Sequence, residues 1–76
     1  MTLGKKMKLI RVEKDLTQSE LAEKMKVKQS YVSQLELDKL KPKKMYIALF
    51  CLIFRISEKD LFREVDDFVS DGKRNS

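Results

Sequence analysis

Apolar side chains recur along this chain at intervals of three and four residues, the spacing of one face of an α-helix, and no run alternates strictly as a half-buried strand would. Only two glycines and one proline interrupt the 76 residues. The pattern predicts an all-α chain with one domain over residues 1–69 and a disordered polar tail over residues 70–76. Five helices are expected, over residues 3–14, 18–25, 29–37, 44–54 and 58–68.

The segment from residue 17 to residue 35 is the most informative part of the pattern. Thr17 and Glu20 have the spacing of a capping box, in which each side chain bonds to the backbone N–H of the other, so a helix is expected to start at residue 18. The next helix points Val32 and Leu35 inward. Its outer face carries small and amide side chains, a surface shaped to lie in a DNA major groove. The outward residues are Ser30, Ser33, Gln34 and Leu37, with Gln29 at the exposed start.

Several short motifs together carry a family resemblance. They are Arg11, TQSELAEK at 17–24, Val27, Val32, QLE at 34–36, KLKP at 39–42 and ISEKDLF at 56–62. Over residues 3–62 the chain resembles the Cro/phage-repressor type of helix-turn-helix domain, the XRE family of bacterial and phage regulators. The resemblance implies a compact, five-helix, lambda-repressor-like DNA-binding domain whose second and third helices form the helix-turn-helix.

The chain departs from the family pattern in its turns. Lys26, Asp38 and Arg55 stand where the family usually or often has glycine. At Lys26 and Asp38 a left-handed backbone is therefore expected, which aspartate tolerates and which is mildly costly for lysine. Lys28 replaces the Ser or Thr that usually caps the third helix, which weakens the local cap. We expect the turns to differ slightly in shape and the unit to be kept.

The outer face of the third helix is interpreted as the base-reading surface. A glutamine can form a bidentate pair with N6 and N7 of adenine, and serine is small enough to let the helix approach the bases. The alternative is that these are merely solvated polar side chains, but the surrounding motif favours contact with DNA. The predicted base-reading residues are Gln29, Ser30, Ser33 and Gln34.

Phosphate contacts are expected beside that helix. Gln18 lies at the start of the second helix, where free backbone amides and the helix dipole favour an anion. Tyr31 has two open interpretations: its ring packs on the flank, or its hydroxyl meets a phosphate. Any single lysine is as readily solvated as bound, but a cluster of lysines would form a salt-sensitive clamp. The basic set is Lys28, Lys39, Lys41, Lys43 and Lys44.

Arg11 and Glu36 are charged residues near the recognition helix, yet they are assigned a structural role. The family resemblance implies that they form a partly buried ion pair tying the first helix to the end of the third. Removal of one partner would then destabilise the fold by several kcal/mol, about 3–5 if the burial is deep.

The C-terminal half has more apolar residues than one helix face needs. Either the fifth helix covers the second side of the fourth, or a partner subunit covers it. The favoured hypothesis is a C2 homodimer, which would place two recognition helices ~34 Å apart on a palindromic site. The predicted interface consists of Leu49, Leu52, Ile53, Phe62, Val65 and Phe68.

Composition narrows the function further. The net charge of +5 suggests an anionic partner, and the motif indicates that this partner is double-stranded DNA. One cysteine and no histidine exclude an internal disulfide and a Cys/His zinc set. Cys51 is interpreted as a core side chain in a reducing cytosol. No secretory signal is expected, and the longest apolar run, residues 47–54, is far short of the ~20 residues that span a bilayer.

The sequence thus predicts a cytoplasmic, bacterial or phage-encoded transcriptional regulator. We expect a dimeric, sequence-specific repressor that reads a palindromic operator and needs no cofactor, metal or small-molecule effector. No convergent acid or nucleophile set suggests an enzyme. The alternative is that the same fold serves as a protein-interaction module or antitoxin-type adaptor.

Overall fold

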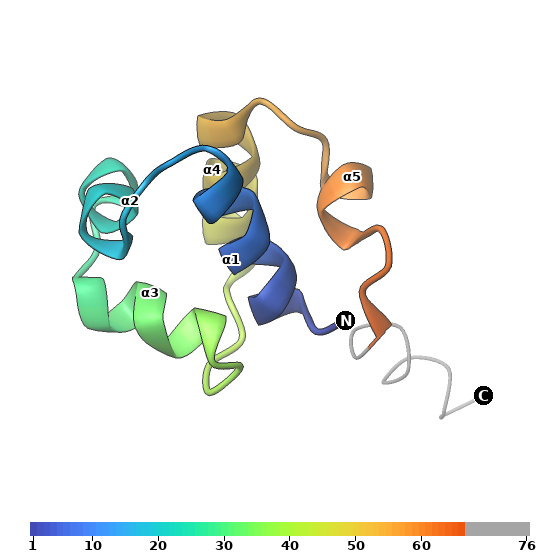
Figure 1. The fold of residues 1–76 in the computed structure, drawn as a ribbon, viewed down its shortest axis with the longest axis horizontal. Coiled ribbons are helices and arrows are strands. Elements are labelled where there is room, and N and C mark those ends of the chain that lie inside the picture. The colour runs from blue at the N-terminus through green and yellow to red at the C-terminus, as the bar shows by residue number, and fades with distance from the viewer. Residues whose placement is uncertain (67–76) are drawn as a thin grey trace.

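Five helices follow one another in the computed structural model, which describes residues 1–66. Helices α1 and α4 lie at the centre, with α2 and α3 on one side and α5 on the other (Figure 1). Among the described residues no strand occurs, so the predicted all-α architecture is confirmed. The helices are α1 (Leu3–Glu13), α2 (Gln18–Met25), α3 (Gln29–Glu36), α4 (Lys44–Phe54) and α5 (Glu58–Phe62).

The core lies between α1, α2 and α4 and is closed by α3 and α5. Phe50 of α4 is fully buried and packs against Phe54, with ring centroids 4.6 Å apart. Val32 and Leu35 point inward from α3, as predicted. Burial of these side chains is the main stabilising contribution to so small a domain. The buried apolar residues are Leu3, Met7, Ile10, Leu21, Ala22, Met25, Val32, Leu35, Phe50, Cys51, Phe54, Leu61 and Val65.

Local side-chain chemistry sets where the helices begin. The predicted capping box is present at α2: the hydroxyl oxygen of Thr17 accepts from the Glu20 N–H at 3.0 Å, and Glu20 Oε1 accepts from the Thr17 N–H at 2.8 Å. At α5, the hydroxyl oxygen of Ser57 accepts from the Asp60 N–H at 3.0 Å. Helix α3 follows Lys28 without a side-chain cap. Its start therefore depends on tertiary contacts more than the other two starts do.

Left-handed residues terminate the helices, and none of them is glycine. Asp15, Lys26, Asp38, Arg55 and Glu64 have φ values between 56° and 67°. Lys26 and Asp38 are the two positions where a left-handed backbone was expected from the missing glycines. The turns of the helix-turn-helix thus keep the ordinary left-handed geometry despite the substitutions, at a modest conformational cost.

Asp38 does more than turn the chain. Its carboxylate accepts from the Gly4 N–H at 2.9 Å and from the Thr2 hydroxyl at 2.6 Å, so it caps the start of α1 from the end of α3. The two backbones approach so closely that a Cβ on Gly4 would lie 2.3 Å from the carbonyl oxygen of Leu35. The C-terminal end of α3 is therefore held directly against the first turn of α1.

The last helix is shorter than the sequence pattern predicts. It ends at Phe62 instead of continuing to residue 68, because Arg63 is extended and Glu64 is left-handed. This break turns Val65 into the core, where it is 3% exposed. The segment is held to α1 by the Arg63 carbonyl oxygen, which accepts from Lys6 Nζ at 2.9 Å. Phe68 and the predicted tail over residues 70–76 lie outside the described residues.

Cys51 is buried in the core, consistent with its position in an apolar run. Burial, then the nearby carboxylates of Glu58 and Asp60, raises the pKa of its thiol. No helix over residues 1–66 has the length and hydrophobicity needed to cross a membrane.

Candidate DNA-reading surface

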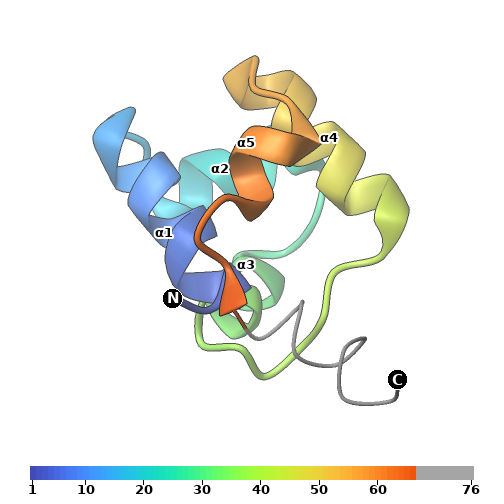
Figure 2. The ribbon, with the colours of Figure 1, turned by 90° about the vertical axis from the view of Figure 1, so that its right-hand side faces the viewer.

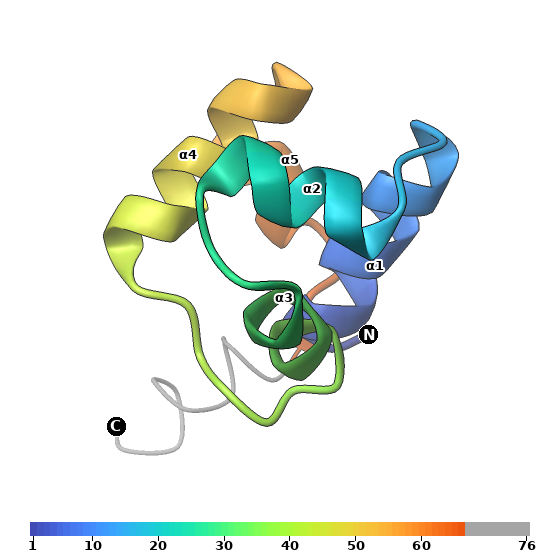
Figure 3. The same cartoon turned by 90° about the vertical axis from the view of Figure 1, so that its left-hand side faces the viewer.

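Helix α3 runs along an outer edge of the molecule (Figure 1), and α2 lies above it in the view of Figure 3. Three of the four predicted base-reading side chains, Gln29, Ser30 and Gln34, are exposed, while Ser33 is half-buried. Val32 and Leu35 anchor the opposite face in the core, so the rotation of the helix about its axis is set by burial. The outer face is thereby presented to solvent as one polar surface.

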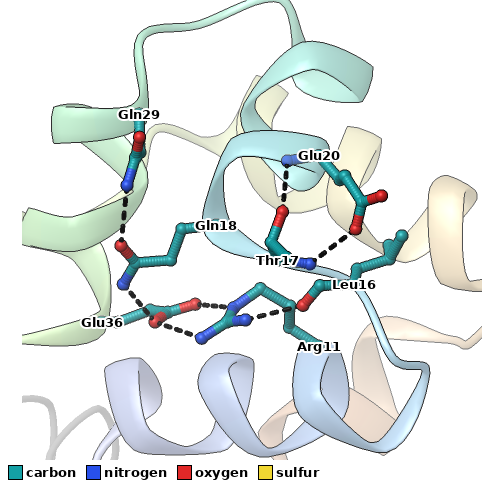
Figure 4. Close-up of polar contacts among 7 residues, drawn as sticks. All are labelled: Arg11, Leu16, Thr17, Gln18, Glu20, Gln29 and Glu36. Carbon is teal, nitrogen blue, oxygen red and sulfur yellow. Dashed lines mark hydrogen bonds and ion pairs between the residues drawn. The ribbon is translucent and has the colours of Figure 1, made fainter.

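A buried ion pair holds this helix in place. Nε of Arg11 lies 2.6 Å from Glu36 Oε2, and Nη2 donates to Glu36 Oε1 at 3.1 Å (Figure 4). The two side chains are 10% and 4% exposed. Nη1 of Arg11 donates to the Leu16 carbonyl oxygen at 2.7 Å. One guanidinium therefore connects α1, the loop before α2 and the end of α3 with bidentate geometry.

A chain of amides leads from this ion pair to the exposed face of α3 (Figure 4). Nε2 of Gln18 donates to Glu36 Oε1 at 2.9 Å. Nε2 of Gln29 in turn donates to Gln18 Oε1 at 3.4 Å. The hydroxyl of Ser19 donates to Gln29 Oε1 at 3.0 Å. Gln29 is thus the outermost member of a network that begins at a buried charge.

The Gln18 side chain is not free to contact a phosphate in the way the sequence suggests. It is half-buried, and both ends of its amide have protein partners. The first N–H groups of a helix, by contrast, have no acceptor within the helix. An anion at the start of α2 would therefore meet backbone N–H groups first.

The predicted basic set surrounds α3. All five lysines are exposed: Lys28 precedes the first residue of α3, Lys39 and Lys41 lie in the loop that follows α3, and Lys43 and Lys44 lie at the start of α4. Positive charge is therefore available at both ends of the polar face.

The ring of Tyr31 packs against α4, and the residue is also partly exposed. Its ring centroid lies 5.1 Å from that of Tyr46 in α4, and the residue is half-buried. Desolvation, then the neighbouring Tyr46, raises the pKa of the Tyr31 hydroxyl, whereas a backbone hydrogen bond from Lys43 lowers it. The pKa lies above the ordinary value for tyrosine, so the hydroxyl is protonated near neutral pH and could donate to an anion.

Sequence reasoning missed two side chains that shape this surface. Ser19 was treated only as part of the capping motif, yet it contacts Gln29 across the turn. Asp38 was considered only as a backbone departure, yet its carboxylate joins α3 to α1. Neither contact has a local sequence signal, because its partners lie 10 and 34 residues away along the chain.

The predicted dimer residues do not all lie on one open surface. Leu52 of α4 is 73% exposed, and Leu49, Ile53 and Phe62 are half-buried. Helices α4 and α5 lie side by side, so the half-buried residues are partly covered within the chain (Figure 2). The assignment of Val65 to the interface was wrong, because the break after Phe62 turns it into the core of its own chain.

Comparison with known proteins gives the context of this geometry. Residues 7–61 match the model of the family described as helix-turn-helix. The immunity repressor protein of Bacillus phage phi105 is 45% identical over 42 residues, which make up 55% of this chain and 29% of the repressor. The matched region thus spans less than a third of that repressor's length.

Solved structures of regulators have the same fold. The clp gene regulator ClgR from Corynebacterium glutamicum is similar over 82% of this chain and 66% of its own, with a TM-score of 0.77 and 31% identity. The master regulator for biofilm formation SinR, solved in complex with DNA, is similar over 80% of this chain and 98% of its own, with a TM-score of 0.74 and 31% identity. The chain therefore belongs to the helix-turn-helix family, of the Cro/phage-repressor type found in DNA-binding transcription regulators.

Proposed function

We propose that this chain is a sequence-specific regulator of transcription, a dimeric repressor that inserts α3 into the major groove of a palindromic operator. The observation that carries the proposal is the polar outer face of α3, with exposed Gln29, Ser30 and Gln34 on a helix whose other face is fixed in the core. Similarity to SinR, a protein solved in complex with DNA, supports it.

Base recognition would come from the amide side chains. Gln29 and Gln34 occupy the first and sixth positions of α3 and are both exposed. Each can accept from N6 of an adenine and donate to its N7, the bidentate pair that distinguishes A·T from the other base pairs. Ser30 lets the helix approach closely, and Ser33 offers a hydroxyl near the groove wall.

Affinity without sequence preference would come from the basic set and from the start of α2. Phosphates around α3 would be neutralised by the five exposed lysines Lys28, Lys39, Lys41, Lys43 and Lys44. The free N–H groups at the start of α2 and the Tyr31 hydroxyl would add neutral donors. Binding of this kind releases counterions, so the affinity for DNA should fall steeply as salt rises.

The dimer would form through α4 and α5. Leu52 is the most exposed large apolar residue of the described chain, and half-buried Leu49, Ile53 and Phe62 lie on the same pair of helices. Phe68 remains a predicted member of this interface. Two copies related by a two-fold axis would present two α3 helices about one DNA turn, ~34 Å, apart.

Selection of bound sequences from a random pool of double-stranded DNA tests the proposal as a whole. We expect enrichment of two inverted half-sites whose centres are about 10 base pairs apart. Enrichment of single half-sites without inverted symmetry would contradict the dimer. Failure to enrich any sequence at low salt would contradict the proposed function.

Alanine at both Gln29 and Gln34 should relax specificity while the fold is kept, because both side chains are exposed. We expect discrimination to fall by about 1–3 kcal/mol at each contacted base pair. Fluorescence anisotropy with the selected operator and single-base variants measures this. Glu23→Ala, an exposed change on α2, is the matched control and should leave discrimination unchanged. Unchanged discrimination in the double variant would show that these residues do not read bases.

The second candidate is a protein-interaction module or antitoxin-type adaptor with the same fold. Its supporting observation is the exposed apolar surface on α4, where Met45 and Leu52 are 65% and 73% exposed. Such a module would bind no DNA even at low salt, so the selection experiment separates the two candidates.

A further inference from the structure

We propose that Leu37 reads the methyl group of a thymine in the major groove, beside the base pair that faces Gln34. The inference rests on the proposed function, because it concerns what α3 meets when it enters the groove. Leu37 is the C-cap residue of α3 and is 62% exposed. It places a large apolar side chain on a face that is otherwise made of serine and amide groups.

The backbone keeps Leu37 in the helical register of α3. Its N–H donates to the Ser33 carbonyl oxygen at 3.1 Å, the contact between residues four apart that defines an α-helix. At about 100° per residue, Leu37 therefore points between the directions of Ser33 and Gln34, one turn further along, and lies two turns beyond Ser30. These three residues form the face through which α3 would approach the bases, so Leu37 belongs to the same face.

Contacts on either side of Leu37 hold the end of the helix. The Lys39 N–H donates to the Gln34 carbonyl oxygen at 2.9 Å. The Asp38 carboxylate accepts from the Gly4 N–H at 2.9 Å and so attaches the next residue to α1. The exposure of Leu37 is therefore a result of where a fixed backbone directs its side chain.

Thymine carries the chemical group that matches a leucine. The edges of the bases in the major groove present hydrogen-bond donors and acceptors, together with the C5-methyl group of thymine. Against N4 of cytosine or O6 of guanine, Leu37 would displace water without replacing its hydrogen bond. Against the thymine methyl group, apolar surface is removed from water on both sides of the contact. Leu37 should therefore favour thymine over the other bases.

The spacing along α3 indicates which base pair carries this thymine. Leu37 lies ~4.5 Å further along the helix axis than Gln34. Successive base pairs are ~3.4 Å apart along DNA. With α3 lying along the groove, the two side chains would therefore meet neighbouring base pairs. Exposed Lys39 follows two residues later and would hold a phosphate at the same end of the helix.

The experiment removes the methyl group without changing base pairing. The base pair that faces Gln34 is first identified as the one whose preference is lost in Gln34→Ala. Deoxyuridine, which differs from thymidine only in lacking the C5-methyl group, then replaces each thymidine of one half-site in turn. Dissociation constants are measured for wild type, Leu37→Ala and Leu37→Met. The Leu37 side chain is largely exposed, so the fold should be kept in both variants.

We expect one substitution, next to the base pair that faces Gln34, to weaken wild-type binding by about fourfold, the value of one methyl group removed from water. Leu37→Ala should bind the thymine and uracil operators equally at that position, and Leu37→Met should keep the wild-type ratio. Leu9→Ala makes the same change at a partly exposed leucine of α1 and should also keep the ratio.

Three results would overturn the inference. They are a selected half-site without thymine at that base pair, a thymine-over-uracil ratio that Leu37→Ala leaves unchanged, and equal weakening of Leu37→Ala on both operators. Absence of DNA binding by the wild type would instead overturn the proposed function.

Discussion

Replacement of Glu36 by alanine is expected to lower the free energy of unfolding by about 3–5 kcal/mol, because it leaves a buried guanidinium without its counterion. The carboxylate accepts from Arg11 at 2.6 Å and 3.1 Å and from Gln18 at 2.9 Å. Without it, Arg11 retains the carbonyl oxygen of Leu16 as an acceptor. Small domains have a total stability of only about 5–15 kcal/mol, so urea unfolding should show a large shift of the midpoint.

Two comparisons make this prediction specific to the ion pair. Glu23→Ala removes an exposed carboxylate and should change stability by no more than about 0.5 kcal/mol. Alanine at both Arg11 and Glu36 should cost less than the sum of the two single changes, because no unpaired buried charge remains. If Glu36→Ala were no more destabilising than Glu23→Ala, the pair would not brace the fold.

Replacement of Gly4 by alanine should also destabilise the domain strongly, by about 3 kcal/mol. The added Cβ would lie 2.3 Å from the Leu35 carbonyl oxygen and 2.8 Å from that of Glu36. Both atoms belong to the backbone, so α1 and α3 would have to move apart. A loss of stability in Gly4→Ala would be informative, because alanine inside a helix is otherwise favoured over glycine by about 1 kcal/mol.

Thermal or urea unfolding of Gly4→Ala beside Lys5→Ala provides the test. Lys5 is exposed in the same turn of α1, so its replacement should leave stability nearly unchanged. A Gly4→Ala variant as stable as the wild type would show that the junction of α1 and α3 is looser than described.

Much of the fold could be predicted because the relevant signals are local. The Thr17–Glu20 box marks the first residue of α2, and the apolar spacing on α3 correctly separates Val32 and Leu35 from the polar face. The last helix could not be predicted in the same way. Its apolar spacing continues past Phe62, but a left-handed Glu64 ends it and sends Val65 into the core. That choice depends on tertiary packing, which overrides local helical pattern.

The candidate site was predicted residue by residue but not as a connected network. The outward position of Gln29 follows from helical spacing, and the Arg11–Glu36 pair follows from the family resemblance. The bridge through Gln18 and the contact from Ser19 join side chains of different helices, and their geometry depends on how α2 crosses α3. No periodicity within one helix carries that information.

Under the proposed function, the double use of Glu36 limits how base preference could change in descendants of this chain. Its carboxylate forms the ion pair with Arg11 and also accepts a hydrogen bond from Gln18. A mutation at Gln18 or Glu36 that altered base preference would therefore also lower the free energy of unfolding. Gln34 lies further along α3 and is exposed. A substitution at Gln34 would leave the contacts of Glu36 with Arg11 and Gln18 in place. Under the proposed function, a change of base preference should therefore begin at exposed Gln34, with Gln18 the slower position to change.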